Sequence, residues 1–152
     1  IGPNVFKGYW QMPEKTAAEF RNDGWFITGD LSTMDEEGRV SIVGRAKDLI
    51  ISGGYNIYPK EIEGEIDLIP GVKESAVIGV PHKDFGEGVT AVVVADGSAD
   101  ITESVIVSAL DGKLARFKQP KRVYIVEELP RNTMGKVQKA QLRDQYQDSY
   151  AS

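Results

Sequence analysis

The stretch Gly44-Arg45-Ala46-Lys47-Asp48-Leu49-Ile50-Ile51 decides the organisation of this chain, because the spacing of apolar residues changes across it. Before it, Val40 and Ile42 alternate with polar or smaller residues, as in one strand of a hairpin. After it, short apolar strands alternate with segments of helical periodicity. The charged, glycine-started segment 44–48 therefore predicts a boundary between two parts of the chain.

The segment upstream of this boundary predicts a loop, a short helix and a hairpin. The helix begins near Pro13, since proline is tolerated in a first turn. Residues 24–31, Gly-Trp-Phe-Ile-Thr-Gly-Asp-Leu, indicate a short aromatic strand. The hairpin turns at residues 35–38, Asp-Glu-Glu-Gly, and continues into a strand at 39–43. We interpret the acidic residues of this turn as solvated, rather than as a catalytic acid and base.

The segment downstream predicts strands and helices that share a buried core. Two continuous apolar runs, at 72–80 and 88–96, are typical of central strands. A further strand is expected at 123–126, and a polar helix at about 137–146. Two amphipathic helices are predicted, each with apolar residues on one face. The first begins at Pro59 and carries Ile62, Ile66 and Ile69. The second begins after Thr102 and carries Ile106, Leu110 and Leu114.

The composition is that of a globular protein. The chain has 152 residues, of which 41% are hydrophobic and 27% charged, as in an ordinary soluble domain. No apolar run approaches the roughly 20 residues of a membrane span. No cysteine is present to form a disulfide, a thiolate nucleophile or a metal site. The absence of cysteine favours a reducing compartment, and we expect a cytoplasmic location. Because the first residue is Ile1, we expect a fragment of a longer protein.

Charge is distributed unevenly along the sequence. The net charge is −5, which argues mildly against nucleic acid as a partner. Between residues 113 and 139 there are eight basic and two acidic residues, a local charge of +6. Such a surface suits a small polyanion, for example a nucleotide or a phosphorylated cofactor, and a solvated charged face gives the same pattern.

One lysine, Lys136, stands in the turn-forming stretch Pro-Arg-Asn-Thr-Met-Gly-Lys-Val at 130–137. The turn residues predict that Lys136 lies at the tip of a mobile connection. A Walker phosphate loop is excluded, because Pro130 and Val137 stand where that motif needs a glycine and a hydroxyl residue. A solvated surface lysine remains an alternative. The only histidine, His82, has no nucleophile near it in sequence, and we interpret it as a hydrogen-bonding loop residue.

Three separated motifs stand in order at residues 25–31, 44–63 and 130–136. The first is Trp-Phe-Ile-Thr-Gly-Asp-Leu, the second contains Gly-Arg-Ala-Lys-Asp and Ser-Gly-Gly-Tyr, and the third is Pro-Arg-Asn-Thr-Met-Gly-Lys. Together they resemble the adenylate-forming (AMP-binding) enzymes, which include acyl-CoA synthetases, non-ribosomal peptide adenylation domains and beetle luciferases. The resemblance covers essentially the whole chain, which looks most like an acyl-CoA synthetase and is similar to malonyl-CoA synthetases.

In that family a large N-terminal domain carries the ATP phosphate loop and the acyl pocket, and a small domain closes over it. Neither the Ser/Thr/Gly-rich phosphate loop nor the aromatic-Gly-x-Thr-Glu stretch occurs here. The resemblance therefore implies that residues 1–45 are the C-terminal end of the large domain and that 46–152 are the complete, mobile lid domain. It implies an α+β fold, with a short mixed or antiparallel β-sheet flanked by helices and preceded by a β-hairpin.

The resemblance also implies roles for individual residues. Asp30 matches an aspartate that accepts hydrogen bonds from both ribose hydroxyls, and Arg45 matches an arginine near the nucleotide. A surface salt bridge is the alternative for each. Lys136 matches the catalytic lysine that holds the attacking carboxylate and the α-phosphate together. Because the same lysine is reversibly acetylated in related bacterial enzymes, Lys136 is also a candidate modification site.

The two half-reactions of the family imply a hinge and a second loop. Lys47 occupies the hinge position, where many members have aspartate and lysine is a known variant. After rotation about the hinge, Ser52, Gly53, Gly54 and Tyr55 would lie beside the adenylate and the pantetheine arm of CoA. A plain tight turn is the alternative for these residues. Charge alone, without a motif, suggests that the CoA phosphates are attracted by a basic cluster of Arg116, Lys118, Lys121 and Arg122.

The resemblance implies an ATP-dependent acyl-CoA synthetase that forms acyl-AMP and then acyl-CoA by domain alternation, with the fragment alone inactive. Malonate is the expected acid, and an aryl- or fatty-acyl-CoA ligase is an alternative. Another alternative is a non-catalytic fragment that serves as a substrate of a protein lysine acetyltransferase. ATP or AMP, CoA and Mg²⁺ are the implied cofactors, with the metal held mainly outside this fragment, which is expected to hold none. Nucleic acid and membranes are not expected partners.

Overall fold

The computed structural model describes residues 1–151 and divides the chain into two compact units, Ile1–Asp30 and a second unit that begins at Leu31. This division lies upstream of the boundary predicted after residue 45. The predicted boundary concerns parts that rotate against each other, and it stays a prediction. Within the described chain, no helix has both the length and the apolar character needed to cross a membrane.

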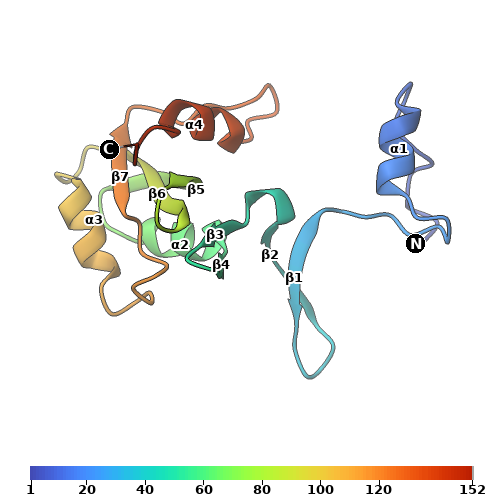
Figure 1. Cartoon of the computed structure of the whole chain (residues 1–152), viewed down its shortest axis with the longest axis horizontal. Coiled ribbons are helices and arrows are strands. Elements are labelled where there is room, and N and C mark those ends of the chain that lie inside the picture. Colours follow the sequence, from blue (N-terminus) through green and yellow to red (C-terminus); the bar gives the residue numbers. More distant parts are fainter. Residues whose placement is uncertain (152) are drawn as a thin grey trace. The chain divides into compact units, whose positions relative to one another are not determined.

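The first unit contains one helix, α1 (Pro13–Glu19), which begins at the proline as predicted (Figure 1). An aromatic cluster organises the rest of the unit. The ring of Phe6 meets the rings of Tyr9, Phe20 and Phe26 edge-on, with centroids 5.1, 5.3 and 5.2 Å apart. Edge-to-face contacts at this distance are favourable. These four rings therefore form the apolar cluster around which the first unit packs.

The prediction of an aromatic strand at residues 24–31 is wrong. Only one residue of its aromatic part pairs, Phe26, in an isolated antiparallel bridge with Phe20. Gly24 and Gly29 have φ angles of 86° and 71°, and these left-handed conformations interrupt an extended backbone. A regular strand, β1 (Asp30–Met34), begins only after the second glycine.

The predicted hairpin is confirmed as a two-stranded sheet of β1 and β2 (Val40–Arg45), drawn in cyan in Figure 1. Its turn is built by Asp35, whose carboxylate accepts hydrogen bonds from the amides of Glu37 at 3.0 Å and Arg39 at 2.9 Å. The hydrogen bonds from the side chain and the backbone of Arg39 lower the pKa of Asp35. The acidic residues here therefore form an exposed turn, as interpreted from the sequence.

A five-stranded mixed sheet forms the centre of the second unit. Its strands are β3 (Ile50–Ser52), β4 (Tyr55–Ile57), β5 (Val72–His82), β6 (Gly86–Ala95) and β7 (Arg122–Val126). The order is β4-β3-β6-β5, with antiparallel pairs, and β7 pairs with β6 in parallel. In register, Ala91 of β6 lies opposite Val77 of β5 and Val123 of β7. The predicted α+β fold is confirmed.

Helices cover both faces of this sheet (Figure 1). The helices α2 (Pro59–Ile66) and α3 (Glu103–Leu110) pack on one face, where Val77 joins their core, and α4 (Lys139–Tyr146) packs on the other, where Ile78 does. Because successive residues of a strand point to opposite faces, a strand covered on both sides is apolar throughout. This explains the two continuous apolar runs of the sequence.

The ends of the helices follow local chemistry. The hydroxyl of Thr102 accepts a hydrogen bond from the amide of Val105 at 3.4 Å, which confirms the predicted cap of α3. That helix ends at Leu110, earlier than the predicted pattern, and Gly112 follows with a φ angle of 75°. Leu114 lies beyond the helix and is nevertheless buried in the same core. The apolar spacing therefore predicted burial correctly and helix length incorrectly.

Candidate functional site

The loop that carries Lys136 is a closed turn between β7 and α4. An antiparallel bridge joins Arg131 to Val137 across its base. Inside it, the amide of Asn132 donates to the carbonyl of Lys136 at 2.9 Å, and the amide of Gly135 donates to the carbonyl of Asn132 at 2.9 Å. These hydrogen bonds define a compact turn, and the mobility of this connection stays a prediction.

One side chain folds the tip of this loop. The Oδ1 atom of Asn132 accepts hydrogen bonds from the amides of Met134 at 3.0 Å and Lys136 at 2.9 Å. Gly135 has a φ angle of 77°, a conformation that favours glycine. The side chain of Lys136 is exposed, and within residues 1–151 its ammonium has no hydrogen-bond or ion-pair partner. The site therefore presents an exposed cation on a hydrogen-bonded turn.

Two ion pairs join the flanks of the loop to the body of the second unit. On one flank, Arg131 pairs with Glu74 of β5. On the other, Lys139 at the start of α4 pairs with Glu63 of α2, with 2.5 Å between Nζ and Oε1. Sequence reasoning missed both pairs. The signal for Glu63 was its place three residues before the core residue Ile66, where a carboxylate on an apolar helix face needs a partner.

The residues predicted as a second loop form a two-residue hairpin turn. Ser52 ends β3 and Tyr55 begins β4, and Gly53 and Gly54 between them have φ angles of 59° and 82°. Two successive positive φ angles are typical of the primed turns of tight hairpins. The turn is tied to its neighbour, since the amide of Gly53 donates to the carbonyl of Phe85 at 2.9 Å.

An aromatic stack lies beside this turn. The exposed ring of Tyr55 stacks on the ring of Phe117, with centroids 4.5 Å apart. The adjacent Lys118 forms an ion pair with Glu61 of α2 at 2.6 Å, so this member of the predicted basic cluster is partly neutralised. Lys121 instead lies over the ring of Phe85, 4.1 Å from its centroid. Aromatic rings and lysine side chains therefore lie beside the Gly53-Gly54 turn.

The predicted hinge residue, Lys47, lies in a short 3₁₀ turn (Ala46–Asp48) after β2. Its carbonyl accepts a hydrogen bond from Arg143 of α4 at 3.4 Å, and the same guanidinium pairs with Asp48 at 2.5 Å. Residues 47 and 48 are therefore tied to the helix that follows the loop of Lys136. The side chain of Lys47 itself is exposed.

The two residues predicted to bind the nucleotide stand at strand ends. Asp30 is the first residue of β1. Its backbone amide donates a hydrogen bond to the hydroxyl oxygen of Thr28 at 3.1 Å. Arg45 is the last residue of β2. Asp30 belongs to the first unit, whereas Arg45, Lys47, the Gly53-Gly54 turn and Lys136 belong to the second. Both side chains interact with other groups of the chain.

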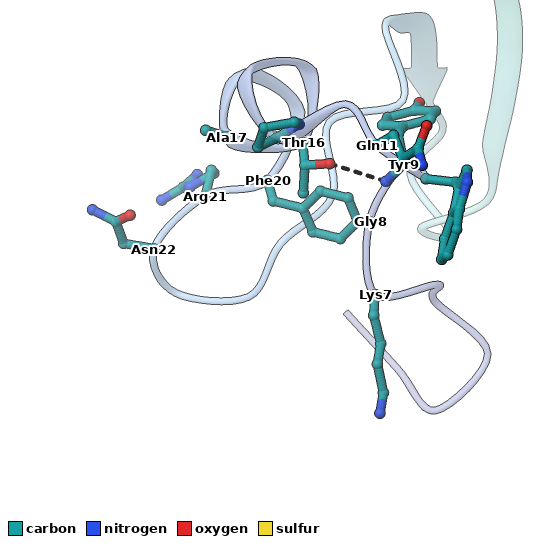
Figure 2. A pocket seen from close by; sticks show the side chains of 11 residues that line it. Lys7, Gly8, Tyr9, Gln11, Thr16, Ala17, Phe20, Arg21 and Asn22 are labelled. Carbon is teal, nitrogen blue, oxygen red and sulfur yellow. Dashed lines mark hydrogen bonds between the residues drawn. The ribbon is translucent and has the colours of Figure 1, made fainter.

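A pocket of about 650 Å³ lies in the first unit and involves none of the predicted site residues. Figure 2 shows its basic and aromatic lining, with the amide of Tyr9 donating to the hydroxyl of Thr16 at 2.9 Å. Lys7 and Arg21 supply its positive charge, and Phe20 supplies a ring. Among residues 1–151 there is no group of three or more acidic or histidine side chains that could hold a metal ion.

The sequence matches a known family over half of its length. The profile of the AMP-binding enzyme C-terminal domain matches residues 61–136, which run from α2 to Lys136. The chain therefore belongs to the AMP-binding enzyme C-terminal domain family. A solved structure superposes on this chain with a TM-score of 0.90, so the two share a fold.

Similar proteins include acyl-CoA ligases of several specificities. ATP-bound MatB from Rhodopseudomonas palustris is 67% identical with a TM-score of 0.90, over 99% of this chain and 30% of that one. The long-chain-fatty-acid–CoA ligase FadD13 of Mycobacterium tuberculosis is 49% identical, over 93% of this chain and 28% of its own length. A feruloyl-CoA synthase from an Amycolatopsis species is 48% identical, over 95% of this chain and 29% of its own. This chain thus spans less than a third of the length of these relatives.

Proposed function

We propose that this chain is the C-terminal part of an AMP-forming acyl-CoA synthetase, in which residues 46–152 act as a lid domain. The observation that carries the proposal is the exposed, unpaired ammonium of Lys136 on a closed, glycine-containing turn. An exposed cation without a partner in the described chain is available to bind an anionic substrate. The family membership and the similarity to several acyl-CoA ligases support the same reaction class.

In the first half-reaction, a carboxylate oxygen of the acid attacks the α-phosphorus of ATP. The bond to the bridging oxygen breaks, and pyrophosphate leaves with its electron pair. The ammonium of Lys136 lies between the two anions, holds them together and offsets the charge that develops on the phosphoryl oxygens. Asp30 accepts hydrogen bonds from the ribose hydroxyls, and Arg45 approaches the nucleotide. Mg²⁺, held mainly by the remainder of the protein, would neutralise phosphate charge.

In the second half-reaction, the thiol sulfur of CoA attacks the acyl carbonyl carbon and forms the C–S bond. The bond from that carbon to the phosphate oxygen breaks, AMP leaves with the electron pair, and the thiol proton is released to solvent. Rotation about Lys47 withdraws Lys136 and brings the Ser52–Tyr55 turn to the adenylate. The tie between Arg143 and residues 47–48 supports this role, because it makes the chain beyond Lys47 move together with α4. A Cβ added at Gly54 would meet no atom within 4 Å, so this side of the turn has room for a pantetheine arm.

Malonate is the proposed acid. Support comes from the resemblance of the sequence to malonyl-CoA synthetases and from the 67% identity to MatB. FadD13 and the feruloyl-CoA synthase keep fatty and aryl acids as alternatives, at 49% and 48% identity. The acyl pocket itself would lie in the large domain. Acetylation of Lys136 by a protein lysine acetyltransferase is a further proposal from the family resemblance, and it would remove the cation that adenylation requires.

The test uses the full-length protein that contains this chain. Carboxylate-dependent exchange of pyrophosphate into ATP is measured with malonate, a long-chain fatty acid and a cinnamate-type acid. We expect exchange with malonate above the other two. Lys136→Ala should slow exchange by orders of magnitude and leave thioester formation from supplied acyl-AMP largely intact. Equal loss in both steps would refute the role of Lys136, and exchange by the 152-residue fragment alone would refute the domain assignment.

A further inference from the structure

The guanidinium of Arg131 bridges the tip of the Lys136 loop and the central sheet. Its Nη1 atom donates to the carbonyl oxygen of Gly135 at 2.6 Å, and its Nη2 atom donates to the carboxylate of Glu74 in β5. The carbonyl of Gly135 belongs to the peptide bond that leads into Lys136. One planar side chain therefore fixes the peptide next to the lysine and anchors it to a strand of the sheet.

No other polar link performs this task in the described chain. The hydrogen bonds of residues 132–136 otherwise close the loop on itself, through Asn132 and through the amide of Gly135. They set the shape of the turn. Leu129 and Val137, which flank the loop, pack on the core that contains Ile78 of β5 and so position its base. Beyond the loop, the ion pair between Lys139 and Glu63 fixes the start of α4. Only Arg131 joins the tip itself to the body of the second unit.

We propose that Arg131 is a positioning residue for Lys136 and that Glu74 holds Arg131 in place. The inference rests on the proposed function of Lys136 in adenylation and adds the residues that aim its ammonium. A cation that must bridge a carboxylate and an α-phosphate has to be placed closely, because a misplacement of about 1 Å can cost about 100-fold in rate. An anchored turn meets this need better than a flexible loop.

The side chain must be arginine for a geometric reason. A guanidinium offers several N–H donors in one rigid plane and can bind a carbonyl and a carboxylate together, whereas an ammonium is a compact point charge. The pair is partly exposed, with 42% of the Arg131 side chain and 27% of the Glu74 side chain accessible. Such surface pairs contribute little to folding stability. Removing Arg131 should therefore displace Lys136 without unfolding the domain.

The test compares variants of the full-length protein in the two half-reactions separately. We expect Arg131→Ala to slow pyrophosphate exchange about 10- to 100-fold, and Arg131→Lys to slow it comparably although the charge is kept. Glu74→Gln should have a smaller effect in the same direction, since an uncharged acceptor remains. Thioester formation from supplied acyl-AMP should be unchanged in all three. Arg39→Ala is the matched control, because Arg39 pairs with Asp35 and Glu37 at the hairpin tip.

A second readout follows the loop directly. Hydrogen exchange of the Lys136 amide, which donates to Asn132, should be faster in Arg131→Ala than in the parent protein and unchanged in Arg39→Ala. Full exchange activity in Arg131→Lys, or equal losses in both half-reactions for Arg131→Ala, would overturn the positioning role. Full activity of Lys136→Ala would overturn the proposed function as well. Loss in Lys136→Ala together with full activity in Arg131→Ala overturns the present inference alone.

Discussion

The carboxylate of Glu63 in α2 accepts hydrogen bonds from the ammonium of Lys139 at 2.5 Å and from the amide of Val77 in β5 at 2.9 Å. β5 lies at one edge of the sheet and pairs only with β6, so this carboxylate covers an edge amide that no strand satisfies. A single buried acid therefore joins α2, the edge of the sheet and the start of α4.

Replacing Glu63 should lower the free energy of unfolding of the second unit more than a substitution at an exposed residue does. Glu63→Ala leaves the Val77 amide without an acceptor and the Lys139 ammonium without its ion-pair partner. Because the Lys139 side chain is 19% exposed, the cost should lie below the about 3–5 kcal/mol typical of a fully buried ion pair. Glu63→Gln should cost less, because its amide oxygen can still accept from Val77. Urea unfolding followed by circular dichroism measures both variants.

The matched control for this change is Glu61→Ala in the same helix. Glu61 pairs with Lys118, and its side chain is 41% exposed. Exposed pairs contribute about 0–1 kcal/mol, so this variant should unfold close to the parent protein. If Glu61→Ala and Glu63→Ala shift the urea midpoint equally, the buried pair has no special role.

Tyr150 gives the second unit a dependence on alkaline pH. Its hydroxyl donates to the carbonyl of Val89 at 3.1 Å and lies 2.9 Å from the hydroxyl of Thr90. Burial raises the pKa of Tyr150 above its ordinary value of 10.0. The folded state therefore retains the phenolic proton more tightly than the unfolded state does. Its contribution to stability is complete below pH 10.0 and is lost as the pH rises through the folded-state pKa.

We expect Tyr150→Phe to flatten this alkaline loss of stability. Phenylalanine has no proton to lose, so the urea midpoint should fall less between about pH 9 and pH 11 than in the parent protein. Burial also raises the pKa of Tyr146, so part of the slope should remain until Tyr146→Phe is added. An unchanged slope in the double variant would assign the alkaline sensitivity to other groups.

Substitution of Gly54 separates the two interpretations of the Ser52–Tyr55 turn. A side chain at Gly54 meets no atom within 4 Å, but the φ angle of 82° strains most residues. Asparagine tolerates this conformation, so Gly54→Asn should fold almost normally. If pantetheine passes this turn, Gly54→Asn slows thioester formation and leaves pyrophosphate exchange intact. If both half-reactions keep their full rates, the Ser52–Tyr55 segment is a plain tight turn with no role in CoA binding.

Much of the fold was predictable because its cause is local. Apolar spacing placed the strands β5 and β6 and the buried faces of α2 and α3, and Thr102 marked the start of α3. Of the two strands predicted as central, β6 is central and β5 lies at an edge of the sheet, although it is covered on both faces. The aromatic segment at 24–31 was not predictable in the same way. Its aromatic residues favour a strand, but Gly24 and Gly29 take left-handed conformations and the side chains pack around Phe6 instead. Tertiary packing overrides propensity there.

The candidate site was predictable only in part. Lys136, Lys47 and the Gly53-Gly54 turn came from motifs, but their supports are pairs distant in sequence. Arg131 and Glu74 are 57 residues apart, and Lys139 and Glu63 are 76 apart. Which charged side chains meet depends on how α2, β5 and α4 assemble, and no local pattern records it. That the ammonium of Lys136 has no partner in the described chain can likewise be recognised only from the assembled structure, in which Arg131 and Lys139 pair with Glu74 and Glu63.

The hinge assignment of Lys47 predicts a selective effect of proline. Proline fixes its own φ angle and restricts the residue before it, so Lys47→Pro should hinder rotation at the 3₁₀ turn 46–48. The carbonyl of residue 47 persists, and the contact with Arg143 can remain. We expect one half-reaction near the parent rate and the other slowed at least about tenfold, whereas Lys47→Ala should leave both rates nearly unchanged. Single-turnover measurement of acyl-AMP formation and of thioester formation tests this, and parent rates in both steps for Lys47→Pro would place the hinge elsewhere.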